Sequence, residues 1–196
     1  LFLINTNVSM KKKLSDILNK KNKVKITAIA AYTTSITKII DNYVDIILVG
    51  DSLGMTIYGM KNTQSVTLNM MKEHARAVNN SAKKSFTIVD MPYKTYENKR
   101  SALLNAKDLL KYSNCDAIKI ETDESKVEIV KHLTDNNIKV VSHIGITPQK
   151  YKNFDKIKHV GQTKKNSNKL LILAKELEKA KTCIIVLECM KTNIAK

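Results

Sequence analysis

This 196-residue sequence has only three cysteines and lacks the long apolar run of a membrane-spanning helix. Its three cysteines, Cys115, Cys183 and Cys189, are an odd number without C-x-x-C spacing, which predicts neither a disulfide framework nor a zinc site. No stretch approaches the roughly 18 uninterrupted apolar residues of a membrane helix. We therefore expect a protein of the reducing cytoplasm that has no membrane partner.

Arginine is also scarce, since Arg76 and Arg100 are the only two, although the formal net charge is +16. Proteins that read guanine or grip phosphate in a fixed geometry use the arginine fork, and the lysines here are spread along the chain. We therefore expect no nucleic-acid partner and interpret the charge as an attraction for small anionic molecules. A lysine-rich binding protein without catalysis is the alternative from another functional class.

The N-terminal residues differ from a secretory signal. In LFLINTNVSMKKK the apolar tetrad precedes the positive charges, which reverses the order of a signal peptide, and it is too short for one. Residue 1 is not methionine, so Met10 is a candidate for the true start. We expect an N-terminal extension with a helix over 1–23 and a single domain over 24–196.

Short continuous apolar runs fill the rest of the sequence, and this pattern is typical of strands that are buried on both faces of a parallel sheet. The predicted strands span 24–32, 45–51, 85–90, 116–121, 138–143 and 182–188. Between most of them lie segments with helical spacing of apolar residues. Repeated alternation of strand and helix predicts a parallel α/β fold, and the low counts of glycine (5) and proline (2) predict short loops.

Capping residues mark two of the expected helices. Thr67 can cap a helix over 68–82, and Asp123 can cap another that follows it. Further helices are expected over 98–112 and around 170–177. The polar segment 149–167 is expected to be a solvated loop, with an active-site lid as the alternative.

Five of the six apolar runs end in a side chain that can bind a metal or move a proton, namely Asp51, Asp90, Glu121, His143 and Glu188. Taken singly, a strand-end aspartate is often a turn residue and a lone histidine is often a core residue. In a parallel sheet, however, all carboxyl ends of the strands lie on one face, where ligands bind. We therefore expect these five side chains to converge. Carboxylates without a cysteine favour Mg²⁺ over zinc.

Two more residues belong to the predicted site. Lys119 stands two positions before Glu121 and so points to the same side of its strand. It either pairs with neighbouring carboxylates or holds a substrate carboxylate and stabilises an enolate. Ser52 can offer a hydroxyl and a backbone N–H to the same anion. The residues alone thus predict a metal-assisted reaction on a small anionic substrate, an oxo acid.

Eight stretches of the sequence resemble one enzyme family in order and spacing, from about residue 25 to 190. They are KITAIAAYTT, VDIILVGDSLGM, SVTLNMMKEHARAV, TIVDMPYKTY, DAIKIE, VVSHIGITPQ, HVGQT and CIIVLEC. The family is ketopantoate (3-methyl-2-oxobutanoate) hydroxymethyltransferase. The resemblance implies a (β/α)₈ TIM-type barrel of the phosphoenolpyruvate/pyruvate superfamily, usually a decamer. It also implies transfer of the one-carbon unit of 5,10-methylenetetrahydrofolate to 3-methyl-2-oxobutanoate, giving 2-dehydropantoate for pantothenate synthesis.

The resemblance also implies a role for each site residue. Asp51 and Asp90 match the Mg²⁺ ligands, and Glu121 matches a third acidic member that acts through water. The same two aspartates contact the substrate together with Ser52.

At the other matching positions, Lys119 would neutralise the substrate carboxylate and His143 would be its polar neighbour. Glu188 matches the general base that removes the C3 proton and creates an enolate, which Mg²⁺ stabilises by chelation.

The sequence departs from the family in two places. Thr33 and Thr34 follow Tyr32 where the family commonly has an aspartate, which puts the first helix and part of the pocket rim in doubt. The family also continues through two further strands after the segment that ends here at Lys196, so we expect about six of the eight barrel strands. The alternatives are an inactive or weakly active truncated remnant and, less favoured, a lyase or mutase of the isocitrate lyase-like superfamily. The latter would carry a cysteine loop where MPYKTY stands.

Overall fold

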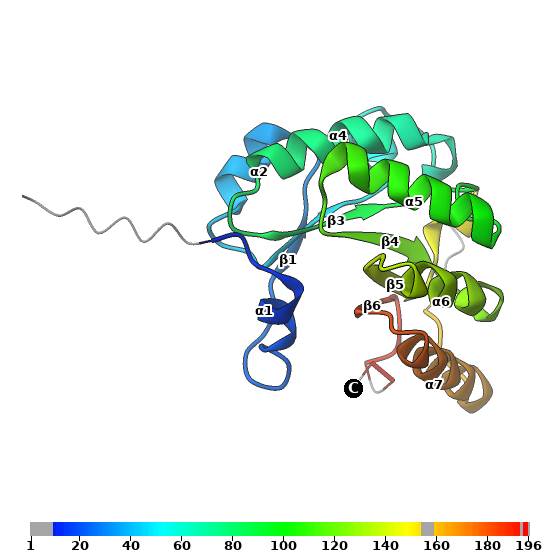
Figure 1. Ribbon diagram of the computed structural model, residues 1–196. Coiled ribbons are helices and arrows are strands. Elements are labelled where there is room, and N and C mark those ends of the chain that lie inside the picture. The colour runs from blue at the N-terminus through cyan, green and yellow to red at the C-terminus, as the bar shows by residue number, and fades with distance from the viewer. Residues whose placement is uncertain (1–9, 154–158, 193, 196) are drawn as a thin grey trace, which may run out of the picture.

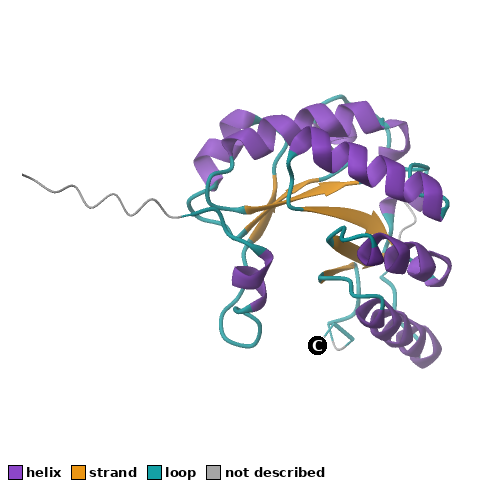
Figure 2. Ribbon diagram, in the orientation of Figure 1, coloured by secondary structure: helices purple, strands orange, loops and turns teal. Residues whose placement is uncertain are grey.

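The computed structural model of the chain describes residues 10–153, 159–192 and 194–195. Six parallel strands form one sheet in the order β1-β2-β3-β4-β5-β6, so every strand lies beside its neighbour in sequence. The strands are β1 (Ala28–Ala30), β2 (Ile46–Val49), β3 (Phe86–Asp90), β4 (Ala117–Glu121), β5 (Val140–Gly145) and β6 (Ile184–Glu188). The sheet curls and the helices between strands cover its outer side, which gives an incomplete α/β barrel (Figures 1 and 2).

The helices that connect the strands begin at residues whose side chains accept a backbone N–H of the first turn. Thr33, Thr67, Asn98 and Thr163 do so at the starts of α2, α4, α5 and α7. The α-helices are α1 (Leu14–Leu18), α2 (Thr34–Ile40), α3 (Leu53–Thr56), α4 (Leu68–Ser81), α5 (Lys99–Ser113), α6 (Val127–Asp135) and α7 (Lys164–Lys179). Three 3₁₀ turns are η1 (Thr63–Ser65), η2 (Glu124–Lys126) and η3 (Pro148–Lys150).

All six predicted strands are confirmed, although the first is shorter than the predicted 24–32. The cap at Thr67 is confirmed, and Asp123 caps the turn η2, which leads directly into α6. In the predicted loop 149–167, η3 forms the start and α7 already begins at 164, while residues 154–158 lie outside the described residues. The predicted N-terminal helix is α1, and the apolar tetrad of residues 1–4 lies outside the described residues.

The main core lies between the outer face of the sheet and the helices. Ile47, Val49, Val89 and Ile118 from the strands pack in one cluster with residues of α4, α5, α6 and α7, such as Val78. Each of these five side chains is fully buried. Because alternate residues of a strand face opposite sides of the sheet, their sequence neighbours point into the curl.

The inner face of the sheet changes from apolar to polar along the strands. At the amino-terminal end of the barrel, Ile46, Phe86 and Val141 form a second cluster that Ile17 of α1 joins. Farther along, the inward positions carry charged groups, which come together at the carboxyl end. The inner core thus closes the bottom of the barrel and leaves the top for ligands.

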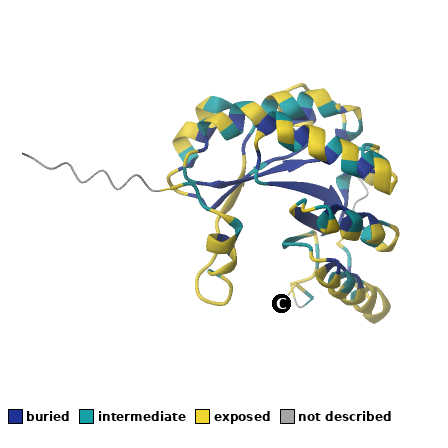
Figure 3. Cartoon of the chain, viewed as in Figure 1, coloured by how far each residue is buried: buried dark blue, intermediate teal, exposed yellow. Residues whose placement is uncertain are grey.

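Burial is uneven across the sheet (Figure 3). Every residue of β3 and β4 is buried, whereas all three residues of β1 are exposed and β6 is largely half-buried. Across the described ranges, none of the helices combines the length and apolar character required to traverse a bilayer.

Candidate active site

A cavity of about 320 Å³ opens at the carboxyl ends of the strands, inside the curl of the sheet. The seven site residues predicted from the sequence all line it: Asp51, Ser52, Asp90, Lys119, Glu121, His143 and Glu188. They come from the ends of β2, β3, β4, β5 and β6 and from the start of α3. The predicted convergence is therefore confirmed.

A buried ion pair lies at the centre of this cavity. Lys119 Nζ is 3.0 Å from Asp90 Oδ1, and both side chains are less than a tenth exposed. Burial alone would lower the pKa of Lys119, but the carboxylates of Asp90 and Asp51 outweigh it and raise the pKa above its ordinary value. The ammonium group is therefore charged at neutral pH. Asp90 Oδ2 accepts the backbone N–H of Asp51 (3.1 Å), which ties the ends of β2 and β3 together.

Two further carboxyl groups beside this ion pair, those of Asp51 and Glu121, have raised pKa values. Burial, together with the negative charge of Asp90, raises the pKa of Asp51 to about 7. Burial likewise raises the pKa of Glu121 to about 8, although the backbone N–H of Gln149 and the Lys119 charge oppose the shift. The cavity thus places three carboxyl groups around one ammonium group, and a further cation would favour the ionised forms of Asp51 and Glu121.

His143 links the central lysine to the carboxylate of β6. Its Nδ1 lies 3.5 Å from Lys119 Nζ, and its Nε2 lies 3.1 Å from Glu188 Oε2. An ammonium group can only donate, so Nδ1 is the acceptor and Nε2 carries the hydrogen that faces Glu188. This hydrogen bond lowers the pKa of Glu188, against the opposing effect of burial. Glu188 is therefore an ionised carboxylate at neutral pH.

Gly145 sets the distance between the last two strands at this point. It pairs with Glu188 and has a φ of +105°. A Cβ at position 145 would lie 2.1 Å from the carbonyl oxygen of Glu188, so any other residue would push β6 away. The glycine thus allows Glu188 to reach His143.

The sequence model for ketopantoate hydroxymethyltransferase matches residues 11–196 of this chain. The chain belongs to this family. A 3-methyl-2-oxobutanoate hydroxymethyltransferase of Pelagibacter ubique is 43% identical over 187 residues, which are 95% of this chain and 72% of that protein. The enzyme of the same name from Aliarcobacter butzleri is 42% identical over 186 residues, 95% of this chain and 69% of the relative.

Solved structures confirm the fold of the family at much lower identity. A phosphonopyruvate hydrolase complex with oxalate and Mg²⁺ superposes with a TM-score of 0.69 at 12% identity over 92% of this chain. A 2,3-dimethylmalate lyase, a member of the PEP mutase/isocitrate lyase superfamily, gives 0.65 at 14% identity over 95% of this chain. This chain spans 64% and 65% of those two chains. At such identities the likeness shows the (β/α) barrel architecture alone.

Ser52, the remaining residue of the predicted site, has a fixed hydroxyl. Its Oγ lies 2.8 Å from the hydroxyl of Tyr32, which follows β1. The two threonines after Tyr32, where the sequence departs from the family pattern, nevertheless begin a helix, because Thr33 accepts the N–H of Ile36 (3.4 Å) and caps α2. The doubt about the first helix is resolved by this substitute cap.

The sequence analysis missed Gln149 and Tyr96, which lie against the carboxylates of the cavity. Gln149 Nε2 donates to Asp51 Oδ2 (2.7 Å), and its backbone N–H donates to both carboxylate oxygens of Glu121 (3.1 Å each). Tyr96 donates to Gln149 Oε1 (2.5 Å). Neither residue titrates near neutral pH or ends a strand, so the strand-end pattern could not find them. The segment ITPQ was part of the family resemblance and was the available signal.

The oxygen donors of the cavity fit the Mg²⁺ that the family implies. The protein would supply two of the ligands, and the remaining positions around the ion would be left to other oxygen donors. Nowhere in the described ranges do three or more His, Cys, Asp or Glu side chains group so that they could hold a metal. Asp51 and Asp90 are both buried, and burial followed by the negative charge of Asp90 raises the pKa of Asp51. Mg²⁺ commonly takes one or two carboxylates and fills its shell with water and substrate oxygens.

Proposed function

We propose that this chain transfers a one-carbon unit from 5,10-methylenetetrahydrofolate to C3 of 3-methyl-2-oxobutanoate, with Mg²⁺ as cofactor, to form 2-dehydropantoate. The observation that carries the proposal is the contact chain from Asp90 through Lys119 and His143 to Glu188 in a single cavity. The chain joins Lys119, a cation that can bind the substrate anion, through one histidine to Glu188, a carboxylate that can act as a base, and this supports the proposal. Family membership supports the choice of substrate.

The cavity binds the oxo acid through the ammonium group of Lys119 and the hydroxyl of Ser52. Lys119 is the one basic side chain among the lining residues apart from His143, and its ammonium remains charged at neutral pH. It attracts the substrate carboxylate and the negative charge that develops on the oxo group. Ser52 adds a hydroxyl whose orientation Tyr32 fixes.

Glu188 accepts the proton from C3 of the substrate. A C3–H bond next to an oxo group is a very weak acid, so its removal needs an ionised base at short range. The contact of His143 Nε2 with Glu188 Oε2 (3.1 Å) lowers the pKa of Glu188 and holds the carboxylate beside the cavity. Because Lys119 occupies the other nitrogen of His143, the imidazole orients the carboxylate and does not take the proton itself.

Asp51 and Asp90 would hold Mg²⁺. When bound, the ion supplies Lewis-acid polarisation of the oxo group beside Lys119. The cation would also oppose the two effects that raise the pKa of Asp51, namely burial and the negative charge of Asp90.

The atoms of the reaction balance with one water molecule. The C3–H bond breaks and its proton passes to Glu188, while its electron pair forms a new bond from C3 to the one-carbon unit. Both bonds from the methylene carbon to the folate nitrogens break, and water supplies the hydroxyl group of the transferred unit. The two nitrogens gain the equivalent of the C3 proton and the second proton of the water, and tetrahydrofolate leaves. The half-exposed position of Glu188 lets the proton return to solvent afterwards.

Exchange of the C3 proton in D₂O tests this proposal without the folate. We expect the chain to exchange the C3 proton of 3-methyl-2-oxobutanoate in the presence of Mg²⁺, followed by NMR. Glu188→Gln should slow the exchange about 100-fold or more, the scale of general-base catalysis. Glu178→Gln, at an exposed position of α7, is the matched control and should leave the rate unchanged. Folded protein without Mg²⁺-dependent exchange would contradict the proposal.

A second candidate is binding of the oxo acid with slow turnover. One observation favours it: the Glu188 side chain is 43% exposed, whereas Lys119 and Asp90 are 8% and 4% exposed. The binding groups are thus fixed more firmly than the base. Saturable binding of the oxo acid without proton exchange would identify this case.

A further inference from the structure

Gln149 uses its polar groups to hold two carboxylates of the site at once. It lies in η3, beyond the end of β5, and is 4% exposed. Its side-chain Nε2 donates one hydrogen to Asp51 Oδ2 (2.7 Å) and the other to the carbonyl oxygen of Met91 (3.0 Å). Its backbone N–H donates to Glu121. A buried amide with all its partners present is rigid.

Tyr96 fixes which end of the Gln149 amide faces Asp51. The Tyr96 hydroxyl accepts the backbone N–H of Glu121 (3.3 Å), so its own hydrogen points to Gln149 Oε1 (2.5 Å). The amide oxygen is thereby occupied, and only the NH₂ group can face the aspartate. The bonds form a closed circuit from Glu121 through Tyr96 and Gln149 back to Glu121.

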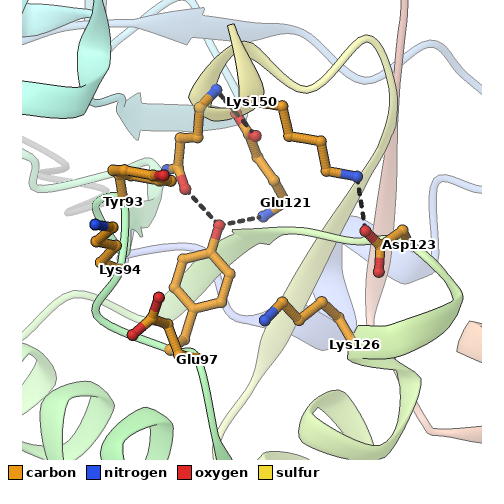
Figure 4. Close-up of a pocket in the computed structure, with 9 residues that line it drawn as sticks. Tyr93, Lys94, Glu97, Glu121, Asp123, Lys126 and Lys150 are labelled. Atoms are coloured by element: carbon orange, nitrogen blue, oxygen red, sulfur yellow. Dashed lines mark hydrogen bonds and ion pairs between the residues drawn. The ribbon is translucent and has the colours of Figure 1, made fainter.

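The backbone of Gln149 is anchored on both sides. Its carbonyl oxygen accepts Gln64 Nε2 (2.8 Å) of η1. The next residue, Lys150, reaches Asp123 at 2.6 Å, as the dashed line in Figure 4 shows. The turn η3 is therefore held against η1 and η2, and its position does not depend on the Asp51 contact.

The three residues of the circuit also line a second cavity. This second cavity of about 120 Å³, shown in Figure 4, is lined by Glu121, Tyr96 and Gln149 together with lysines such as Lys126. Glu121 borders the active-site cavity as well. A small residue at position 149 would enlarge this second cavity, so a test needs a substitute of the same length.

We infer that Gln149 is a positioning residue that orients the Asp51 carboxylate toward the bound cation. Tyr96 supports this role because its hydroxyl fixes the orientation of the Gln149 amide. The hydrogen bond to Asp51 Oδ2 leaves Oδ1 as the oxygen for other ligands, and this orientation persists because the amide cannot turn over. The inference rests on the proposed function, since it needs a cation at Asp51. Partners that orient a metal ligand in this way typically contribute 10- to 100-fold in metal affinity or activity.

Binding of Mn²⁺ tests the inference without any turnover. The free ion is measured by electron paramagnetic resonance in a titration of the full chain at one neutral pH. Gln149→Met has the same length but no amide, and should weaken Mn²⁺ binding about 10- to 100-fold. Tyr96→Phe removes a single hydroxyl and should weaken it in the same direction by less. Gln162→Met, at an exposed position, should bind Mn²⁺ as the wild type does.

The outcomes separate this inference from the proposed function. Wild-type affinity in both Gln149→Met and Tyr96→Phe would overturn the positioning role and leave the cation site standing. No Mn²⁺ binding by the wild-type chain would overturn both. If Gln149→Met does not fold, Tyr96→Phe alone decides, because it keeps a buried aromatic ring in place.

Discussion

The central strands and the edge strands of this sheet serve the site differently. β3 and β4 have neighbours on both sides and are buried throughout, whereas β1 and β6 each pair on one side. Asp90, Lys119 and Glu121, which would bind the cation and the substrate, lie on the central strands. Glu188, the proposed base, lies on β6. The proposed binding groups and the proposed base therefore lie on parts of the sheet that differ in burial.

Amide hydrogen exchange should show the largest difference between these regions. Global opening of a domain costs about 5–15 kcal/mol, whereas fraying at an open edge costs close to nothing. We expect amides of β4 to exchange more slowly than those of β1 by a factor on the order of 1000 or more. Mass spectrometry of peptides that cover 117–121 and 28–30 measures it. Equal rates would show that the sheet opens as one unit.

Removing the central cation should have the next largest effect. Lys119→Met leaves Asp90 buried without its partner, and breaking a buried pair in this way typically costs about 3–5 kcal/mol. We expect a loss of this order in the free energy of unfolding, measured by urea titration, together with loss of oxo-acid binding. Lys175→Met, at an exposed position of α7, is the control and should change neither. An unchanged midpoint for Lys119→Met would show that the pair is not buried as described.

Central and edge carboxylates should respond to pH with opposite signs. The pKa of Asp51 is raised to about 7 and that of Glu121 to about 8, so the folded state holds protons that the unfolded state has already lost. Their contribution to stability therefore falls as pH rises from their ordinary pKa values, 3.8 and 4.5, to the raised values of about 7 and about 8. Glu188 has a lowered pKa, so its contribution is present above its ordinary pKa and is lost as pH falls through the folded value.

Substitution and urea unfolding at different pH values check these signs. Glu121→Gln changes the free energy of unfolding relative to the wild type, and this change should be more stabilising at pH 8 than at pH 5.5. The difference between the two pH values should be on the order of 2 kcal/mol. Glu188→Gln should have the same effect at pH 8 and pH 5.5, because the lowered pKa of Glu188 lies below both values. A change in the opposite direction should appear only between pH 5.5 and about pH 4, and it should be smaller because the Glu188 side chain is 43% exposed and solvent screens it. Added Mg²⁺ should reduce the advantage of Glu121→Gln. Equal signs for the two variants would contradict the comparison.

The strands and the predicted site followed from local patterns in the sequence. Apolar runs that end in titratable groups identify the buried strands, and the period of two explains why Lys119 and Glu121 share the cavity. The start of α7 was predicted too late because residues 164–169 carry no apolar side chains, and only the Thr163 cap marks it. Such a helix start has no periodicity to detect.

The network around Gln149 could not be predicted in the same way. Gln149 and Asp51 are 98 positions apart, and their contact exists only because η3 folds back over the ends of the strands. A neutral amide gives no charge signal in the sequence. Contacts between polar residues so far apart in the sequence can be identified only from the three-dimensional arrangement of the strands.

A second neighbour for β6 should raise turnover while leaving binding nearly unchanged. The curated relatives extend beyond the matched region, since this chain spans 72% of the Pelagibacter ubique protein. We predict that a fusion carrying the part of that relative beyond its match raises the C3 exchange rate at saturating oxo acid by about 10-fold, which corresponds to about 1.4 kcal/mol of barrier. The dissociation constant for the oxo acid, measured by calorimetry, should stay within about threefold, because Lys119 lies on a strand that is already buried on both sides. A fusion that tightens binding of the oxo acid and leaves the exchange rate unchanged would reverse the roles assigned to the central and edge strands. As a control, Glu188→Gln in the fusion should abolish the increase in the C3 exchange rate.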